Sequence, residues 1–300
     1  MSTELSSELP TDTSTESSNP RGSERIDSHH HLWDLGVRPQ GWTADFPVIA
    51  RTFTLAELEP ELAAAGVTGT VLVETINVEP ETGEFLAIAA AHPLVRGVVG
   101  WVDLTAVDVA DRIAGLRELP GGDRLVGVRH QVQLEPDPQW LTRPEVLRGL
   151  AAVADAGLVF DLLVTRSQLP AASEAVERTP RGRFVLSHLG KPGIAARELE
   201  PWSTHVGRLA ASPNVACKLS GMVTEAATAW SVADLQPYAA RVLDAFGPDR
   251  VMAGSDWPVC LLAGGYRQVW AANEQLVADL APAHADAILG GTATSWYGLR

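Results

Sequence analysis

Histidine side chains gather at the end of a short apolar segment near the start of the chain, where His29, His30 and His31 are consecutive. Because side chains alternate along a strand, the imidazoles of His29 and His31 point to one side and that of His30 to the other. Two convergent imidazoles can hold a divalent metal or orient a water molecule. The spacing therefore predicts a functional pair, His29 and His31, with His30 in packing or in a loop. The alternative is a polar strand end that is solvated at the surface.

Two further side chains stand at the ends of later apolar runs. His188 lies in the segment 186–192 (LSHLGKP), and Asp256 lies in the segment 252–258 (MAGSDWP). A neutral imidazole can polarise a carbonyl or bind a metal, although a lone histidine is more often a core residue. A carboxylate beside an apolar tryptophan can take a proton from water, although it could also cap the next turn. We expect a catalytic group formed by Asp256, His188, His29 and His31.

The cofactor requirement stays open at this level. Three imidazoles and one carboxylate suit a single Zn²⁺ ion with an open position for water, and the same groups can also transfer protons without a metal. The prediction is accordingly no required cofactor, or one divalent metal such as Zn²⁺ bound by His29, His31, His188 and Asp256.

Basic and aromatic side chains near the same segments are candidates for substrate contacts. Arginine and lysine there can clamp a carboxylate or stabilise a developing oxyanion, and tryptophan can stack on a ring. Taken singly, a basic residue is more often an ordinary salt-bridge partner, and a tryptophan is usually part of the core. Loop residues 36–51 and 264–265 are also expected to line the pocket. The predicted substrate-binding residues are Arg129, His130, Lys218, Trp33 and Trp257, with Arg166 and Lys191 as further candidates.

Eight short apolar or β-branched segments lead into these residues, and helical patterns separate the segments. Most are near-continuous apolar runs, as in strands of a parallel sheet that are covered on both faces. Barrel enzymes assemble their sites at the carboxyl ends of such strands. The sequence therefore predicts an α/β fold of the (β/α)8 TIM-barrel type. An open doubly wound sheet is less consistent, because no glycine-rich phosphate loop follows the first strand. The predicted strands are residues 25–29, 70–74, 95–103, 125–130, 158–164, 183–188, 214–219 and 250–255.

Helix boundaries can be predicted at several points. Two segments, 54–57 and 142–145, have the spacing of a capping box, in which two side chains each bond to the backbone of the other residue. A further helix is expected between Ser231 and Gly247.

Composition excludes several classes of protein. The 300 residues carry a formal net charge of −14, which would repel nucleic acid and anionic membrane surfaces. No apolar run is long enough for a transmembrane helix, and the start of the chain lacks the pattern of a secretory signal. The two cysteines, Cys217 and Cys260, are too few for a disulfide framework and are expected to be buried apolar residues in a reducing compartment. We expect a cytoplasmic protein. A homo-oligomer is compatible with the sequence, which does not decide the oligomeric state.

The first residues differ in composition from the rest of the chain. Residues 1–23 are mostly Ser, Thr, Glu and Pro and offer little apolar surface to bury. Such a segment cannot offset its ordering entropy, so we expect a disordered N-terminal tail at 1–23 and one domain over residues 24–300.

Six short motifs in series resemble those of the amidohydrolase superfamily, and most closely those of its sugar-lactone hydrolases. That branch includes the L-fucono-1,5-lactonases and L-rhamnonolactonases and is related to the 2-pyrone-4,6-dicarboxylate lactonases. The resemblance covers about residue 24 to residue 300 and rests on the segments 26–34 (IDSHHHLWD), 127–130 (GVRH), 160–163 (FDLL), 186–192 (LSHLGKP), 217–221 (CKLSG) and 254–258 (GSDWP).

The resemblance implies a distorted (β/α)8 barrel that hydrolyses a lactone ester. His29 and His31 match the pair on the family's first strand, His188 matches the histidine on the sixth, and Asp256 matches the aspartate on the eighth. Members with two metals carry a bridging Lys or Glu on the fourth strand and a histidine on the fifth. Here the predicted fourth strand ends at His130 and the fifth has no histidine. The resemblance therefore argues against a two-metal centre, and relatives in this branch can work without any metal.

The predicted function is that of an enzyme of carbohydrate catabolism, a hydrolase of carboxylic ester bonds. It would open a sugar-derived (aldono) lactone, its small-molecule partner, by attack of a water that Asp256 activates. Two alternatives stay open. One is a metal-dependent decarboxylase of an unsaturated or aromatic acid on the same barrel, and the other is a non-catalytic barrel that binds a small ligand.

Overall fold

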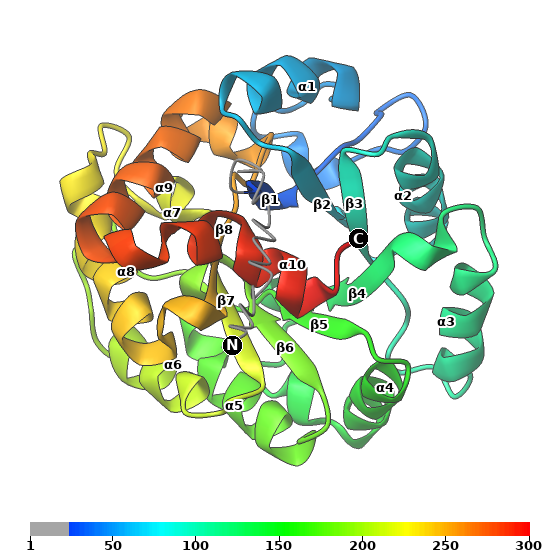
Figure 1. Ribbon diagram of the computed structural model, residues 1–300. Coiled ribbons are helices and arrows are strands. Elements are labelled where there is room, and N and C mark those ends of the chain that lie inside the picture. Colours follow the sequence, from blue (N-terminus) through cyan, green and yellow to red (C-terminus); the bar gives the residue numbers. More distant parts are fainter. Residues whose placement is uncertain (1–23) are drawn as a thin grey trace, which may run out of the picture.

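The computed structural model of the protein describes residues 24–300. Eight parallel strands form one sheet in the order of the sequence, and helices lie around it (Figure 1). Every predicted strand is present, so the prediction of a (β/α)8 barrel is confirmed. The tail predicted at residues 1–23 lies outside the described residues. The strands are β1 Ile26–His30, β2 Gly69–Val73, β3 Val95–Gly100, β4 Leu125–His130, β5 Val159–Leu162, β6 Arg183–Leu186, β7 Val215–Leu219 and β8 Val251–Ala253.

The barrel closes between its first and last strands through a short, irregular seam. The seam contains a parallel bridge between His30 and Trp257, and the backbone N–H of Asp256 donates to the carbonyl of His29 (2.8 Å). The pairing of β1 with β2 also shifts register between Asp27 and His30. The distortion is therefore centred on β1 and on the residues after β8, which carry the histidine pair and the aspartate of the predicted site.

Helices alternate with the strands and form the outer layer of the barrel, with two exceptions. The short α7 lies at the end where the strands finish, and α10 lies across the end at which the strands begin (Figure 1). Within residues 24–300, none of the helices is long and apolar enough to cross a membrane. The helices are α1 Leu55–Ala64, α2 Glu79–Ala91, α3 Val109–Arg117, α4 Pro144–Asp155, α5 Leu169–Arg178, α6 Trp202–Ala210, α7 Met222–Glu225, α8 Val232–Phe246, α9 Tyr266–Leu280 and α10 Thr292–Tyr297.

Apolar side chains form two cores, one between strands and helices and one inside the barrel. Alternation along each strand produces these two layers, because successive side chains point outward and inward. The inner core includes Val159 of β5 and Ala216 of β7, together with Tyr297 of α10. The next inward positions on these strands are Asp161 and Lys218. The side chains inside the barrel are therefore apolar near the starts of these strands and charged nearer to their ends.

The two predicted capping boxes are absent from the structure, although one of the two helices, α1, begins where it was predicted, directly after Thr54. The helix that follows Ser231 begins as predicted, with this serine in a capping box. Helix α4, however, begins at Pro144 with Arg143 as its N-cap, so the capping box predicted over residues 142–145 is wrong. Proline is favoured at the first helical position and sets the start there. The box predicted at 54–57 is also wrong, because the side chain of Thr54 makes no capping bond.

Candidate active site

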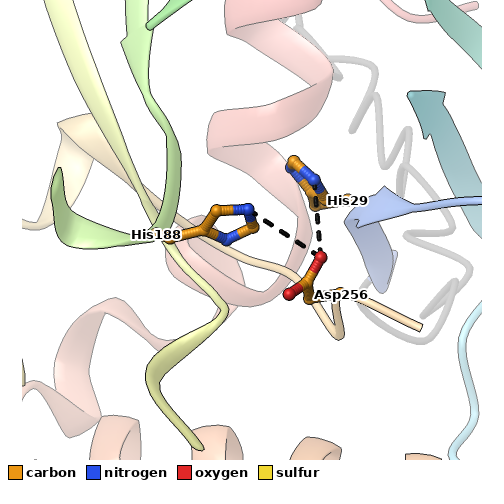
Figure 2. Close-up of side chains that lie close together, drawn as sticks. All are labelled: His29, His188 and Asp256. Carbon is orange, nitrogen blue, oxygen red and sulfur yellow. Dashed lines mark ion pairs between the residues drawn. The ribbon is translucent and has the colours of Figure 1, made fainter. Parts of the chain in front are cut away.

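The four predicted catalytic residues meet at one end of the barrel, which we call the mouth. Oδ1 of Asp256 lies 3.5 Å from Nε2 of His31 and 3.7 Å from Nε2 of His29. Nε2 of His188 lies 3.8 Å from the same oxygen. Figure 2 shows His29 and His188 turned toward the Asp256 carboxylate from different sides. All four side chains are buried. These distances are too long for good hydrogen bonds, so Oδ1 can still accept one from water or substrate.

Unusual backbone conformations aim two of these side chains. His188 has a φ of 52° and Asp256 a φ of 60°, in the left-handed region that favours glycine. Leu189 and Lys191, close behind His188, have φ values of 55° and 54°. Each such residue costs on the order of 1–3 kcal/mol and persists where the surrounding structure holds it. Because this strain is concentrated at the mouth, it supports a functional role for His188 and Asp256.

A cavity of about 230 Å³ opens onto the cluster. His31, His188 and Asp256 belong to its lining, so three of the four predicted catalytic side chains face the space that a ligand would fill. The rest of the lining combines amide and hydroxyl groups with aromatic and aliphatic side chains. It includes Thr75, Gln131, Gln133, Trp42, Phe46 and Leu163.

The hydrogen bond at Nδ1 fixes the tautomer of His31, whereas the one at Nδ1 of His188 allows either tautomer. Nδ1 of His31 donates to the carbonyl oxygen of Val73 (2.7 Å), which can only accept. A neutral His31 ring therefore carries its lone pair at Nε2. Nδ1 of His188 lies 3.0 Å from Oγ of Ser220, a hydroxyl that can donate or accept. Burial lowers the pKa of His188 to about 3, so this ring is neutral and can present either an N–H or a lone pair at Nε2.

His29 lies between two cationic side chains. Nζ of Lys218 is 3.2 Å from its Nδ1, and Nη1 of Arg129 is 3.2 Å from its Nε2. Burial, followed by the charge of Lys218, lowers the pKa of His29 well below 6.5, so the ring is neutral and has one lone pair. In either tautomer a cation donates to that lone pair. When Lys218 donates to Nδ1, the Nε2–H can donate to Nε2 of His31 (3.2 Å), which completes a chain of bonds from Lys218 to Val73.

The Asp256 carboxylate is ionised at neutral pH. Burial raises its pKa, but the neighbouring His188 and His31 outweigh burial and bring the pKa below the ordinary 3.8. An ionised carboxylate that faces a cavity can accept a proton from a bound water.

Behind the mouth, buried ion pairs support the histidines. Nε of Arg129 donates to Oε1 of Glu74 (2.7 Å), and Nζ of Lys218 donates to Oδ2 of Asp161 (2.6 Å). The hydroxyl of Tyr297 donates to Oδ1 of the same aspartate (2.7 Å). We call the group of Asp161, Lys218 and Tyr297 the floor. Because the opposite charges compensate one another, the cations can remain buried in the barrel.

Of the five predicted substrate-binding residues, Arg129 is the one that lines the cavity. Lys218 is fully buried below the histidines. His130 stacks on a neighbouring indole ring and bonds to a glutamate. Trp257 is buried and packs edge-on against a phenylalanine. Trp33 lines a different cavity of about 560 Å³, beside α1 and α2. Sequence position at a strand end therefore did not distinguish packing residues from lining residues.

The structure also adds lining residues that the motifs did not single out. Thr75 and Gln131 each come one residue after a predicted strand, and this position is the signal that could have found them. Trp42 and Phe46 come from the first of the two loops that were expected to line the pocket, whereas residues 264–265 do not line it. Lys191, a further candidate, does line the cavity, while Arg166 pairs with a glutamate on the surface. Both cysteines are buried, as expected.

Donor type and distance would allow one divalent ion at the cluster. One ligand atom from each of His29, His188 and Asp256 lies within 4.8 Å of the others. The hydrogen bonds of His29 oppose this role, because Lys218 or Arg129 already donates to its single lone pair. A metal-binding histidine usually donates its other N–H to an oxygen acceptor, and an ammonium group cannot accept. His29 therefore does not fit a metal ligand.

The chain belongs to the amidohydrolase family, whose model matches residues 26–299. It is 37% identical over 278 residues to an L-fucono-1,5-lactonase from Burkholderia ambifaria, covering 91% of this chain and 95% of the relative. An L-fucono-1,5-lactonase from Burkholderia multivorans is 36% identical over 291 residues, covering 93% and 97%. A crystal structure of an amidohydrolase from Burkholderia multivorans with bound zinc has a TM-score of 0.87 and 36% identity, over 92% of this chain and 100% of that one. The resemblance drawn from the six motifs is confirmed.

Proposed function

We propose that the protein is a hydrolase that opens a sugar-derived lactone to its hydroxy acid. The observation that carries this proposal is a buried, ionised carboxylate, that of Asp256, which faces a cavity and lies 3.5–3.8 Å from three imidazoles. Ester hydrolysis needs a base for the attacking water and a donor for the oxyanion, and the cluster can supply both. The two curated L-fucono-1,5-lactonases, at 36% and 37% identity, support a sugar lactone as the substrate. In this proposal the enzyme acts in the cytoplasm, in carbohydrate catabolism.

Asp256 acts as the general base. Its carboxylate takes a proton from a water in the cavity, and the resulting hydroxide attacks the carbonyl carbon of the lactone to form a tetrahedral oxyanion. The protonated Asp256 then returns this proton to the ring oxygen as the ring C–O bond breaks. One water is consumed, and the new carboxylic acid releases its proton to solvent at neutral pH.

His188 is the adaptable donor at the mouth. With the Ser220 hydroxyl donating to Nδ1, the Nε2–H of His188 can donate to the carbonyl oxygen of the substrate. Arg129 also lines the cavity and adds positive charge there. The chain of bonds described above uses the ring nitrogens of both His29 and His31, so these two fixed rings form the wall beside the attacking water and leave Asp256 to bind it.

The hydrogen bonds of His29 lead us to infer that the reaction needs no resident metal. A bound zinc ion, as in the Burkholderia multivorans structure, would polarise the carbonyl and lower the pKa of a bound water. In this chain the lone pair of His29 is already used by Lys218 or Arg129. We therefore assign the proton transfer to Asp256 and the oxyanion contact to protein N–H groups.

The charges around the cavity favour a neutral lactone over an acidic one. Both cations in its lining are already paired with carboxylates, Arg129 with Glu74 (2.7 Å) and Lys191 with Glu225 (3.0 Å). A substrate carboxylate would therefore meet cations whose charge is already compensated. The aromatic and aliphatic part of the lining offers a surface for a methyl group or a ring face. A 6-deoxyaldonolactone has both properties, and L-fucono-1,5-lactone is the first substrate to test.

A pH-indicator screen of aldonolactones tests the proposal. We expect proton release that matches lactone opening, with L-fucono-1,5-lactone among the active compounds, and an Asp256→Asn protein prepared in parallel controls for contaminating activity. The rate of spontaneous lactone opening is measured in a sample without protein and is subtracted. Release of CO₂ from aromatic or unsaturated acids, with no lactone opened, would contradict the proposal and favour the decarboxylase. Tight lactone binding without turnover would contradict it in favour of a binding protein.

A further inference from the structure

The chain has two lysines among its 23 lysine and arginine residues, and both lie at the proposed active site. Lys218 is fully buried beside His29, and Lys191 lines the cavity. All the other residues in this group of 23 are arginines, including those on the surface. Lysine and arginine differ in geometry and hydration rather than in net charge. The placement therefore indicates a need for the ammonium group itself at these two positions.

A left-handed turn brings Lys191 to the same cavity as His188. All four residues from 188 to 191 have positive φ, between 52° and 71°. The side chains of His188 and Lys191, at the two ends of this turn, both line the cavity. Nζ of Lys191 donates to Oε1 of Glu225 in α7 (3.0 Å), and its side chain is 26% exposed. The ammonium group is thus held in place and remains accessible from the cavity.

The chemistry of the ammonium group explains why lysine stands here. An ammonium carries three N–H donors on one atom, so one can bind Glu225 while two remain for a ligand. A guanidinium would bind Glu225 through its planar fork and present its remaining donors farther away. Burial raises the pKa of Asp256, and the charge of Lys191 contributes to lowering it again, together with the neighbouring His188 and His31. Lys191, His188 and Asp256 line the same cavity, so the amine faces the space that the lactone would fill.

We propose that Lys191 is a catalytic residue whose ammonium group donates a hydrogen bond to the carbonyl oxygen of the bound lactone and stabilises the tetrahedral oxyanion. This inference rests on the proposed function and adds a second donor beside His188. No proton leaves the lysine. Negative charge forms on the carbonyl oxygen as hydroxide adds, and the carbonyl bond re-forms when the ring C–O bond breaks.

Amine-specific labelling tests the inference without a mutation. Residues 1–23 contain no lysine and Lys218 is fully buried, so the reactive amines of the native protein are Lys191 and the α-amino group. The α-amino group has a pKa of about 7.7–8.0, against about 10.4 for lysine, and is blocked first near neutral pH. Lys191 is then either acetylated, which removes its charge, or reductively dimethylated, which keeps it. Peptide mass spectrometry gives the modified fraction, with unmodified Lys218 as the internal check that the protein stayed folded.

Acetylation of Lys191 should lower kcat by about 10²–10³-fold, the usual loss for a missing oxyanion donor, in proportion to the fraction modified. Dimethylation, which keeps the charge but leaves a single N–H, should cost less than acetylation without preserving full activity, and excess hydroxy-acid product should slow acetylation by covering the amine. Unchanged kcat in a fully acetylated protein would overturn the inference. A rise in KM alone would overturn it too, because this pattern indicates ground-state binding rather than stabilisation of the transition state.

Three substitutions test the assignment, two at Lys191 and one at Arg197 as the matched control. Arg197 lies in the same loop as Lys191, also has a positive φ (57°), and its side chain is 87% exposed. The Lys191→Met protein should lose as much activity as the acetylated protein, and the Lys191→Arg protein should keep part of the activity. The Arg197→Met protein should keep full activity. An equal loss in Arg197→Met would show an effect of net charge or of the loop and would overturn the inference. If the unmodified protein opens no lactone, the proposed function fails instead, since every labelled sample is judged against unmodified turnover.

Discussion

At the mouth of the barrel, His188 and Asp256 sit on left-handed backbone, and the Asp256 carboxylate lies 3.5–3.8 Å from three imidazoles beside an open cavity. At the floor, Lys218 of β7 and Tyr297 of α10 both bond to Asp161 at 2.6–2.7 Å, and α10 lies across the end of the barrel at which the strands begin (Figure 1). The mouth holds strain and leaves polar atoms free, whereas the floor pairs its polar atoms with one another. We therefore expect substitutions at the mouth to lower turnover and substitutions at the floor to lower stability.

Asp256→Asn should have the largest effect and should act on turnover. Loss of a positioned proton-transfer group typically lowers kcat by about 10²–10⁴-fold. Asparagine tolerates left-handed backbone well, so the fold and the urea midpoint should change little. Steady-state rates on a verified lactone and a urea unfolding curve measure both effects. Near-normal turnover would remove Asp256 from the mechanism. A large loss of stability would contradict the expectation that substitutions at the mouth act on turnover and those at the floor on stability.

Lys218→Met should be the most destabilising change at the floor. Both Lys218 and Asp161 are fully buried, so removing the cation leaves an unpaired buried carboxylate. Breaking such a pair costs about 3–5 kcal/mol of unfolding free energy, whereas replacing both partners by apolar residues is often neutral. The double variant Asp161→Leu/Lys218→Met is the control. If the single variant is no less stable than the double, the pairing does not hold the floor together.

Tyr297→Phe should have a smaller effect on the same group. The tyrosine hydroxyl donates to Asp161 (2.7 Å), and a buried acceptor that loses its donor costs about 1–3 kcal/mol. Tyr238→Phe is a matched control, because its hydroxyl makes a longer bond (3.3 Å) to a backbone carbonyl. We expect Tyr297→Phe to lower the urea midpoint more than Tyr238→Phe and to leave kcat nearly unchanged. A large loss of kcat would show that the floor takes part in catalysis.

Chelation should have the smallest effect. Because the lone pair of His29 already accepts from Lys218 or Arg129, treatment with EDTA followed by dialysis should leave turnover unchanged. Elemental analysis of the same sample shows whether a metal was removed. Loss of activity with the metal, and its return with added Zn²⁺, would contradict the metal-free mechanism.

The mouth could be predicted from the sequence further than the floor. His29 and His31 follow from the alternation of side chains along a strand, and His188 and Asp256 from their places after apolar runs. The left-handed backbone at His188 and Asp256 has no sequence signal, because neither position holds glycine. The floor was missed because Asp161 lies inside an apolar strand, and its partner Lys218 comes from a strand that is not adjacent in the sheet.

Loop geometry explains the remaining differences. Trp33, Trp257 and His130 stand beside predicted site residues in the sequence, yet each ring packs against other aromatic side chains. Neighbours in sequence share a strand end, but the loop decides which side chain turns toward the cavity. The start of α4 was predicted too early because Thr142 and Glu145 have capping-box spacing, while the proline between them sets the start of the helix.

The pH dependence of kcat/KM tests the central claim most directly, because it identifies the base. The pKa of Asp256 lies below 3.8, so the carboxylate is ionised above that value and is lost as the pH falls through it. We predict that kcat/KM stays constant from about pH 5 to pH 7 and falls only at lower pH. A histidine base or a zinc-bound water titrates near pH 6.5–7. Burial also raises the pKa of Glu74, the partner of Arg129, to about 7. An inflection in that range that persists in a Glu74→Gln protein would therefore contradict the assignment of Asp256 as the base that activates water.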